Sequence, residues 1–150
     1  MASKELINNF LASKKMVVAG VSRNEKKFGK AIYDHLLKND FDITPINPNT
    51  TEINGKQCYP DIKSIPENFE NLYIVTPKSQ TKEIVEQALE KGVKRIWIQQ
   101  MSETKEVIKL IEDAGVELIA KKCMFMFVEP VESIHKFHKF FKNLFGSLYN

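Results

Sequence analysis

Short runs of apolar, often β-branched residues alternate along the chain with longer stretches in which apolar residues recur at helical spacing. The runs occupy residues 16–20, 41–46, 72–75, 95–98 and 116–119. Continuous apolar runs of this length are typical of strands buried on both faces of a parallel sheet. The alternation therefore predicts an α/β fold: an open, doubly wound, mostly parallel five-stranded sheet with its core over residues 16–120.

Helices are expected between these strands and before the first of them. Residues 28–36 carry apolar side chains at helical spacing, and a similar stripe within residues 1–15 predicts a leading helix. Residues 51–71 show no regular pattern except a turn near residues 53–56. Within this segment, residues 64–67 could start one short helical turn.

The two later helices carry recognisable end signals. Ser79 and Ser102 are the expected N-caps, because their hydroxyl groups can accept hydrogen bonds from the first amide groups of a helix. Gly92 and Gly115 are the expected left-handed residues at the C-terminal ends. The two matching exits are typical of successive βα units.

The composition fits one domain over residues 1–150. With 43% hydrophobic residues the chain is long enough to bury a sizeable core, and its net charge of +3 is too small to indicate nucleic-acid binding. Its two cysteines, Cys58 and Cys123, form neither a disulfide framework nor a four-cysteine zinc site. No apolar run approaches the ~18 residues that cross a membrane. The N-terminus lacks a signal pattern, so a cytoplasmic location is expected.

Residues 130–148 predict a trailing, basic amphipathic helix. Its apolar stripe is flanked by Lys136, Lys139 and Lys142. We expect the stripe to pack on the sheet or on a second subunit, as in a homodimer, because so small a domain needs that apolar area buried. Docking on a partner protein, or contact with a membrane surface, is the alternative.

The loop after the first strand carries groups that suit a phosphate. Ligands of open α/β sheets bind beyond the carboxyl ends of the strands, where the strand order reverses. Gly20 permits close approach of the backbone, and Ser22 offers a hydroxyl group. Arg23 and Lys27 add positive charge, and the amide groups that start the next helix also favour an anion. Taken alone, these residues fit a phosphate site and a solvated basic loop about equally well.

The end of the second strand bears on which nucleotide would fit. An NAD site wants a carboxylate there to hold the ribose hydroxyl groups, but this strand ends in Asn47-Pro48-Asn49. Amides accept a phosphorylated ribose, which a carboxylate would repel. Glu52 weakens this argument if its loop folds back.

Several motifs resemble, in the same order, those of small stand-alone CoA-binding proteins. They are VVAGVS at residues 17–22, KFG at 27–29, PINP at 45–48, INGKQCY at 53–59, IP at 65–66, GVK at 92–94, WIQ at 97–99 and AGV at 114–116. The domain is similar to the CoA-binding domain of the succinyl-CoA synthetase alpha subunit and of NDP-forming acyl-CoA synthetases. The similarity covers about residues 12–125, and the joint occurrence of these motifs is far more specific than one glycine loop.

The resemblance implies a Rossmann-like fold with CoA or an acyl-CoA across the strand ends. The first loop would hold the phosphates, the second strand's end the adenosine portion, and the third strand's end the pantetheine arm. Gln99 would face the cleft. The candidate binding residues are Gly20, Ser22, Arg23, Lys27, Phe28, Gly29, Asn47, Pro48, Thr76, Pro77 and Gln99.

The chain also departs from the family pattern. The family usually has a glycine two residues after the glutamine, where this chain has Met101, so we expect a narrower cleft near Gln99. The synthetases need a phosphorylated histidine and an ATP-grasp partner domain, and we expect neither here. His35 lies mid-helix, where packing or exposure explains it better.

We therefore expect a CoA-binding protein without catalysis of its own. The alternatives are an NAD(P)-binding enzyme or redox sensor on the same fold, and a protein-interaction module that uses the trailing helix. No metal site is expected: His135 and His138 lie one helical turn apart, but the lysines beside them disfavour a cation.

Overall fold

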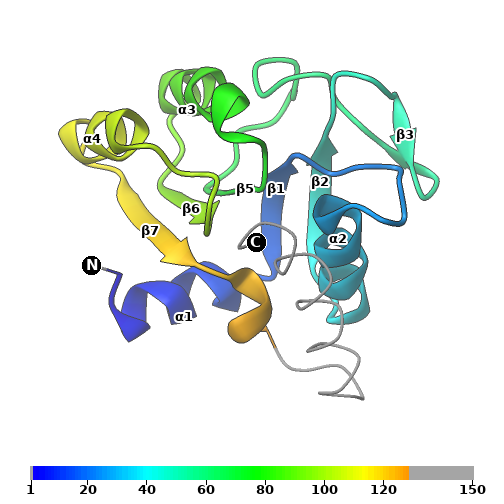
Figure 1. The fold of residues 1–150 in the computed structure, drawn as a ribbon, viewed down its shortest axis with the longest axis horizontal. Coiled ribbons are helices and arrows are strands. Elements are labelled where there is room, and N and C mark those ends of the chain that lie inside the picture. Colours follow the sequence, from blue (N-terminus) through cyan, green and yellow to red (C-terminus); the bar gives the residue numbers. More distant parts are fainter. Residues whose placement is uncertain (1, 129–150) are drawn as a thin grey trace, which may run out of the picture.

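A computed structural model describes residues 2–128 and shows one parallel sheet with helices on both faces (Figure 1). The sheet has five strands in the order β2-β1-β5-β6-β7, and all four neighbouring pairs are parallel. The strands are β1 (Lys15–Ala19), β2 (Asp42–Ile46), β5 (Asn71–Ile74), β6 (Arg95–Gln99) and β7 (Glu117–Lys122). The predicted Rossmann-like, doubly wound α/β fold is confirmed.

Two helices and a short 3-10 turn cover one face of the sheet, and two helices cover the other. The first set is α1 (Lys4–Ala12), α2 (Phe28–Lys38) and the turn Met124–Met126, and the second is α3 (Lys78–Lys91) and α4 (Lys105–Asp113). The strands divide their side chains between the two cores with a period of two. Tyr73 and Trp97 pack under α1 and α2, whereas Leu72 and Ile96 pack under α3 and α4.

The strand order reverses between β1 and β5. The chain leaves β1 through α2 on one face and leaves β5 through α3 on the other, although the two strands are neighbours in the sheet. Their carboxyl ends therefore diverge and open a crevice, which is where ligands of doubly wound sheets bind.

A small hairpin follows β2 in the chain. Strands β3 (Glu52–Ile53) and β4 (Lys56–Gln57) pair antiparallel around Asn54 and Gly55, whose φ angles are 52° and 77°. Positive φ at both turn positions marks the type I′ geometry that Asn-Gly favours. The turn was predicted, but the strands were not. An ion pair of 3.0 Å between Lys56 and Asp42 ties the hairpin to β2.

The C-terminal residues predicted for two helices are confirmed, whereas the predicted N-caps differ from those in the structure. Gly92 and Gly115 have the expected left-handed φ angles of 82° and 72°. Helix α3 already begins at Lys78, so Ser79 lies within its first turn. Helix α4 is capped by Thr104, which accepts from the Val107 amide three residues on, so the predicted cap at Ser102 is wrong.

The edge strand β7 is irregular. Its pairing with β6 shifts register between Trp97 and Gln99, and Lys121 there has a φ of 61°.

The leading helix is confirmed as α1, whereas the predicted helix over residues 130–148 lies outside the described residues. Within residues 2–128, no helix is long and apolar enough to cross a membrane.

Candidate functional site

A cavity of about 460 Å³ opens at the carboxyl edge of the sheet, between the ends of β1, β2 and β5. It is lined by residues 20–22, 46–49, 60–62 and 76–77, and by four side chains of α3. Six of the eleven predicted site residues lie here: Gly20, Ser22, Asn47, Pro48, Thr76 and Pro77. The strand order and the cavity therefore agree on the same crevice.

Two glycines let the first strand, its helix and the neighbouring strand meet without side chains between them. Gly20 has a φ of 105°, and a Cβ there would lie 2.9 Å from the Val75 carbonyl carbon. A Cβ on Gly29 would lie 2.2 Å from the Gly20 carbonyl oxygen. Since neither contact is tolerable, both positions require glycine. Gly29 does not line the cavity; it fixes the start of α2 against the end of β1.

The loop between Gly20 and α2 is shaped by its own polar groups. The Ser22 hydroxyl accepts from the Asn24 amide at 3.0 Å, and the Asn24 side chain accepts from the Lys26 amide at 2.9 Å. Helix α2 then starts at N-cap Lys27, with no side chain capping it. Its first amide groups therefore donate no hydrogen bond to the side chain at the N-cap.

The cations of this loop lie outside the cavity. Arg23 and Lys27 are exposed, and neither lines it. Phe28 contributes to the core instead, with its ring 5.5 Å from the Phe125 ring in an edge-on contact. Lys30, in the first turn of α2, is buried in an ion pair of 2.6 Å with Asp34. The positive charges of this loop therefore lie outside the lining of the cavity.

Asn47 holds two walls of the cavity together. Its side-chain amide donates to the Val21 carbonyl oxygen at 2.7 Å, and its side-chain oxygen accepts from the Asn49 amide at 2.7 Å. Directly behind it, the buried Cys58 thiol donates to the Asn47 carbonyl oxygen at 3.8 Å. Burial raises the pKa of this thiol, although its hydrogen bond to Asn47 opposes the change. Cys58 is therefore a protonated support for the loop.

Thr76 belongs to a buried chain of hydroxyl groups. Its Oγ1 lies 3.0 Å from the Thr81 Oγ1, which also donates to the Ser102 carbonyl oxygen at 2.9 Å. These contacts join the end of β5, the first turns of α3 and the loop before α4. The chain fixes the position of Thr76 and Pro77 at the cavity wall.

Gln99 lies elsewhere. Its side-chain oxygen accepts from the Tyr73 hydroxyl at 2.5 Å and from the Met124 amide at 3.1 Å, so the side chain is buried beneath the 3-10 turn. The expectation that it faces the cleft is corrected, because Gln99 shares the face of Trp97 along β6. Met101 does not line the cavity either, and so does not narrow it.

Two acidic side chains that the sequence did not single out line the cavity. Asp61 comes from the irregular segment, where it accepts hydrogen bonds from the Ser64 amide at 2.9 Å and hydroxyl at 2.5 Å. Glu83 comes from the exposed face of α3. The lining contains no lysine or arginine, and Glu52 stays outside it. The interior of the cavity therefore suits uncharged, hydrogen-bonding groups better than phosphates.

Among the residues that the structure describes, no three metal-ligating side chains come together. His35 is buried in α2 with its ring 4.9 Å from the Phe125 ring, as a packing residue. Burial lowers the pKa of His35, which keeps the ring neutral. His135 and His138 lie outside the described residues.

Comparison with known proteins points to one family. The family described as "CoA binding domain" matches residues 14–129. An ADP-forming acetate–CoA ligase from Archaeoglobus fulgidus is 30% identical over 123 residues, which is 75% of this chain but 18% of the ligase. This chain thus spans less than a fifth of that relative.

Solved structures of small proteins share the fold over nearly their whole length. A conserved hypothetical protein from Pyrococcus furiosus is 32% identical with a TM-score of 0.72, over 75% of this chain and 97% of that one. A hypothetical protein from Pyrococcus horikoshii is 31% identical with a TM-score of 0.78, over 83% and 89%. Domains of this kind therefore occur as small separate chains and within a longer ligase.

Proposed function

Since the chain belongs to the CoA-binding domain family, we propose that it binds CoA or an acyl-CoA at the carboxyl edge of the sheet. One observation carries the proposal: the loops with the family's motifs, after β1, β2 and β5, surround one cavity of about 460 Å³ at the reversal of strand order. A cavity of this volume accepts part of a CoA molecule, and the rest lies over the rim.

The charges around the cavity suggest which part of the ligand lies inside it and which part lies over the loop. Asp61 and Glu83 line the cavity without a lysine or arginine, whereas Arg23 and Lys27 are exposed on the loop at its rim. We place the phosphates over this loop, where the cations and the start of α2 favour them. Uncharged, hydrogen-bonding parts of the ligand occupy the cavity beside Asn47 and Pro77.

We further propose that the protein binds this ligand without catalysing a reaction of its own. Asn47 and Thr76, the polar side chains closest to the strand ends, are held by contacts within the protein. Their role is to shape the cavity walls. Both cysteines are buried free thiols, which is consistent with a reducing cytoplasm, where we propose that the protein acts.

Asp61 supports a second candidate ligand. An NAD-type dinucleotide needs an acid near the ribose, and Asp61 is an acid that lines the cavity, whereas Glu52 lies outside the lining. The expected protein-interaction role of residues 130–148, and any homodimer formed through them, concern a segment outside the described residues.

Isothermal titration calorimetry with CoA, acetyl-CoA and NAD separates these candidates. CoA or acetyl-CoA is expected to bind, and replacing both Arg23 and Lys27 by glutamine should weaken that binding by about tenfold or more. The matched control is Lys38→Gln, an exposed lysine at the other end of α2. Binding of NAD with no response to CoA would reject the proposal in favour of the dinucleotide.

A further inference from the structure

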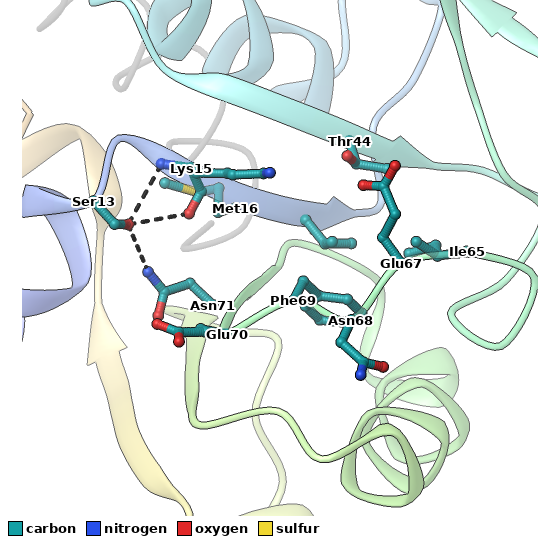
Figure 2. A pocket seen from close by; sticks show the side chains of 11 residues that line it. Ser13, Lys15, Met16, Thr44, Ile65, Glu67, Asn68, Phe69, Glu70 and Asn71 are labelled. Carbon is teal, nitrogen blue, oxygen red and sulfur yellow. Dashed lines mark hydrogen bonds between the residues drawn. The ribbon is translucent and has the colours of Figure 1, made fainter.

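A second cavity, of about 260 Å³, lies at the opposite, amino-terminal end of the strands (Figure 2). It is formed by the first residues of β1, by Thr44 of β2 and by residues 65–71. Residues 58–70 cross from β2 to β5 on this face of the sheet without forming a helix, so no helix covers this corner. The cavity follows from that missing helix.

The floor of this cavity is apolar and firmly built. Val17 and Ile65 line it and are 2% and 4% exposed, and Phe69 adds a half-buried ring. Asn71 forms part of the wall, but its polar atoms are already used. Its side-chain amide donates to the Ser13 hydroxyl at 2.9 Å, and its side-chain oxygen accepts from Arg95 at 3.2 Å. A ligand would therefore meet apolar surface at the floor and find its charged partners at the rim.

The rim offers one positive and one negative charge. Figure 2 shows Lys15 and Glu67 extending from different walls of the cavity. Within the described residues, neither side chain forms an ion pair. Lys15 is near enough to Asp42 to help lower the pKa of that carboxyl, but Asp42 pairs with Lys56 at 3.0 Å.

The third charge on the lining is already neutralised. Glu70 lies 3.0 Å from Lys94 and 3.7 Å from Arg95. An anionic ligand would thus meet the unpaired Glu67, and a cationic ligand would meet the unpaired Lys15. A ligand that carries both charges satisfies both side chains and leaves neither repelled.

We propose that this cavity binds a small zwitterion with an apolar side chain, the chemistry of a free amino acid such as leucine or methionine. Its carboxylate pairs with Lys15, its ammonium group pairs with Glu67, and its side chain lies on Val17, Ile65 and Phe69. The volume of about 260 Å³ admits a molecule of this size. This site does not depend on the CoA proposal, because it lies at the other end of the strands.

An NMR titration of the whole chain with leucine tests the proposal. The amide signals of Val17, Thr44 and Asn71 are expected to shift, and those of Ser22 and Asn47 are expected to stay. Two analogues of leucine, 4-methylpentanoate without the ammonium group and 3-methylbutylamine without the carboxylate, should bind about tenfold more weakly or worse.

Substitutions at Lys15 and Glu67 test whether leucine binds through these two charges. Lys15→Met and Glu67→Gln change exposed side chains, so both variants should fold, and each should lose about tenfold in leucine affinity. Lys4→Met, an exposed lysine on α1, is the control. The proposal fails if leucine, methionine and phenylalanine cause no shifts at millimolar concentration, or if both variants bind as the parent does. CoA affinity, measured on the same samples, reports separately on the proposed function.

Discussion

The Asn47 side-chain amide lies 2.7 Å from the Val21 carbonyl oxygen and joins the loops that follow β1 and β2. These two loops form adjoining walls of the carboxyl-edge cavity. The Asn47 side chain therefore helps to set the spacing of these walls, together with the Gly20 amide, which donates to the Ile46 carbonyl oxygen at 3.2 Å.

Asn47→Ala should widen the cavity and destabilise the fold by about 1–2 kcal/mol, since the Val21 carbonyl oxygen loses its partner. CoA affinity should fall with it, by about tenfold. Chemical denaturation and calorimetry measure the two effects. Asn49→Ala is the matched control. Asn49 donates to the Asn47 side chain only through its backbone amide, which alanine keeps, so this variant should be as stable as the parent protein.

Gly29→Ala should destabilise the protein by about 3 kcal/mol, even though alanine normally favours a helix. The new Cβ would lie 2.2 Å from the Gly20 carbonyl oxygen, so α2 would have to move off β1. The comparison is Gly92→Ala, where no atom lies within 4 Å and only the φ of 82° opposes a side chain. That change should cost about 1 kcal/mol. Equal losses in thermal denaturation would contradict the packing role of Gly29.

Met101→Gly should stabilise the fold by up to about 1 kcal/mol. Met101 has a φ of 82°, a left-handed conformation that suits glycine better than any residue with a Cβ. The exposed side chain contributes little packing, as it is 39% accessible. Met101→Ala keeps the backbone strain and should show no gain in stability. A rise in melting temperature for both variants would mean that relief of this strain is not the cause.

His35 should make stability fall as the solution becomes mildly acidic. Burial lowers the pKa of the folded histidine below its ordinary value, so the unfolded chain binds the proton first. Stability is fully present above the unfolded pKa of about 6.5 and is lost as pH falls below it. Denaturation midpoints between about pH 7 and pH 5.5 measure the slope. His35→Leu should reduce it, and an unchanged slope would show that other groups cause it.

The purified protein should not form ADP from acetate, CoA and ATP above the rate of a blank. The relative with that ligase activity in its name is more than five times as long as the matched region, which is 18% of it. An enzyme-coupled ADP assay checks this directly. ADP formation that follows the protein through purification, and disappears in Asn47→Ala, would establish catalysis by this chain.

The sheet and its helices could be predicted because each element is long enough to show a period. Strand β1 and helix α2 carry uninterrupted patterns, and Gly92 marks a helix end by its conformation. The strands β3 and β4 have two residues each, too few for any period. Only the Asn54-Gly55 pair between them carried a hairpin signal.

Part of the site also followed from the sequence. The loops at Gly20, Asn47 and Thr76 were located, because the carboxyl ends of parallel strands share one edge. Gln99 was misplaced, although the period of two along β6 puts it on the face of the buried Trp97. Asp61 and Glu83 carried no signal. Asp61 and Glu83 line the same cavity because residues 58–70 cross the sheet beside α3, and no local sequence pattern predicts that path.

The irregular edge of β7 has a consequence for the protein in concentrated solution. A straight, bare edge offers a row of amide and carbonyl groups on which the strand of another molecule can continue the sheet. The left-handed turn at Lys121 breaks that row, and the charges of Lys121 and Lys122 oppose a neighbour of the same kind. This rim of the molecule therefore resists growth into fibrils.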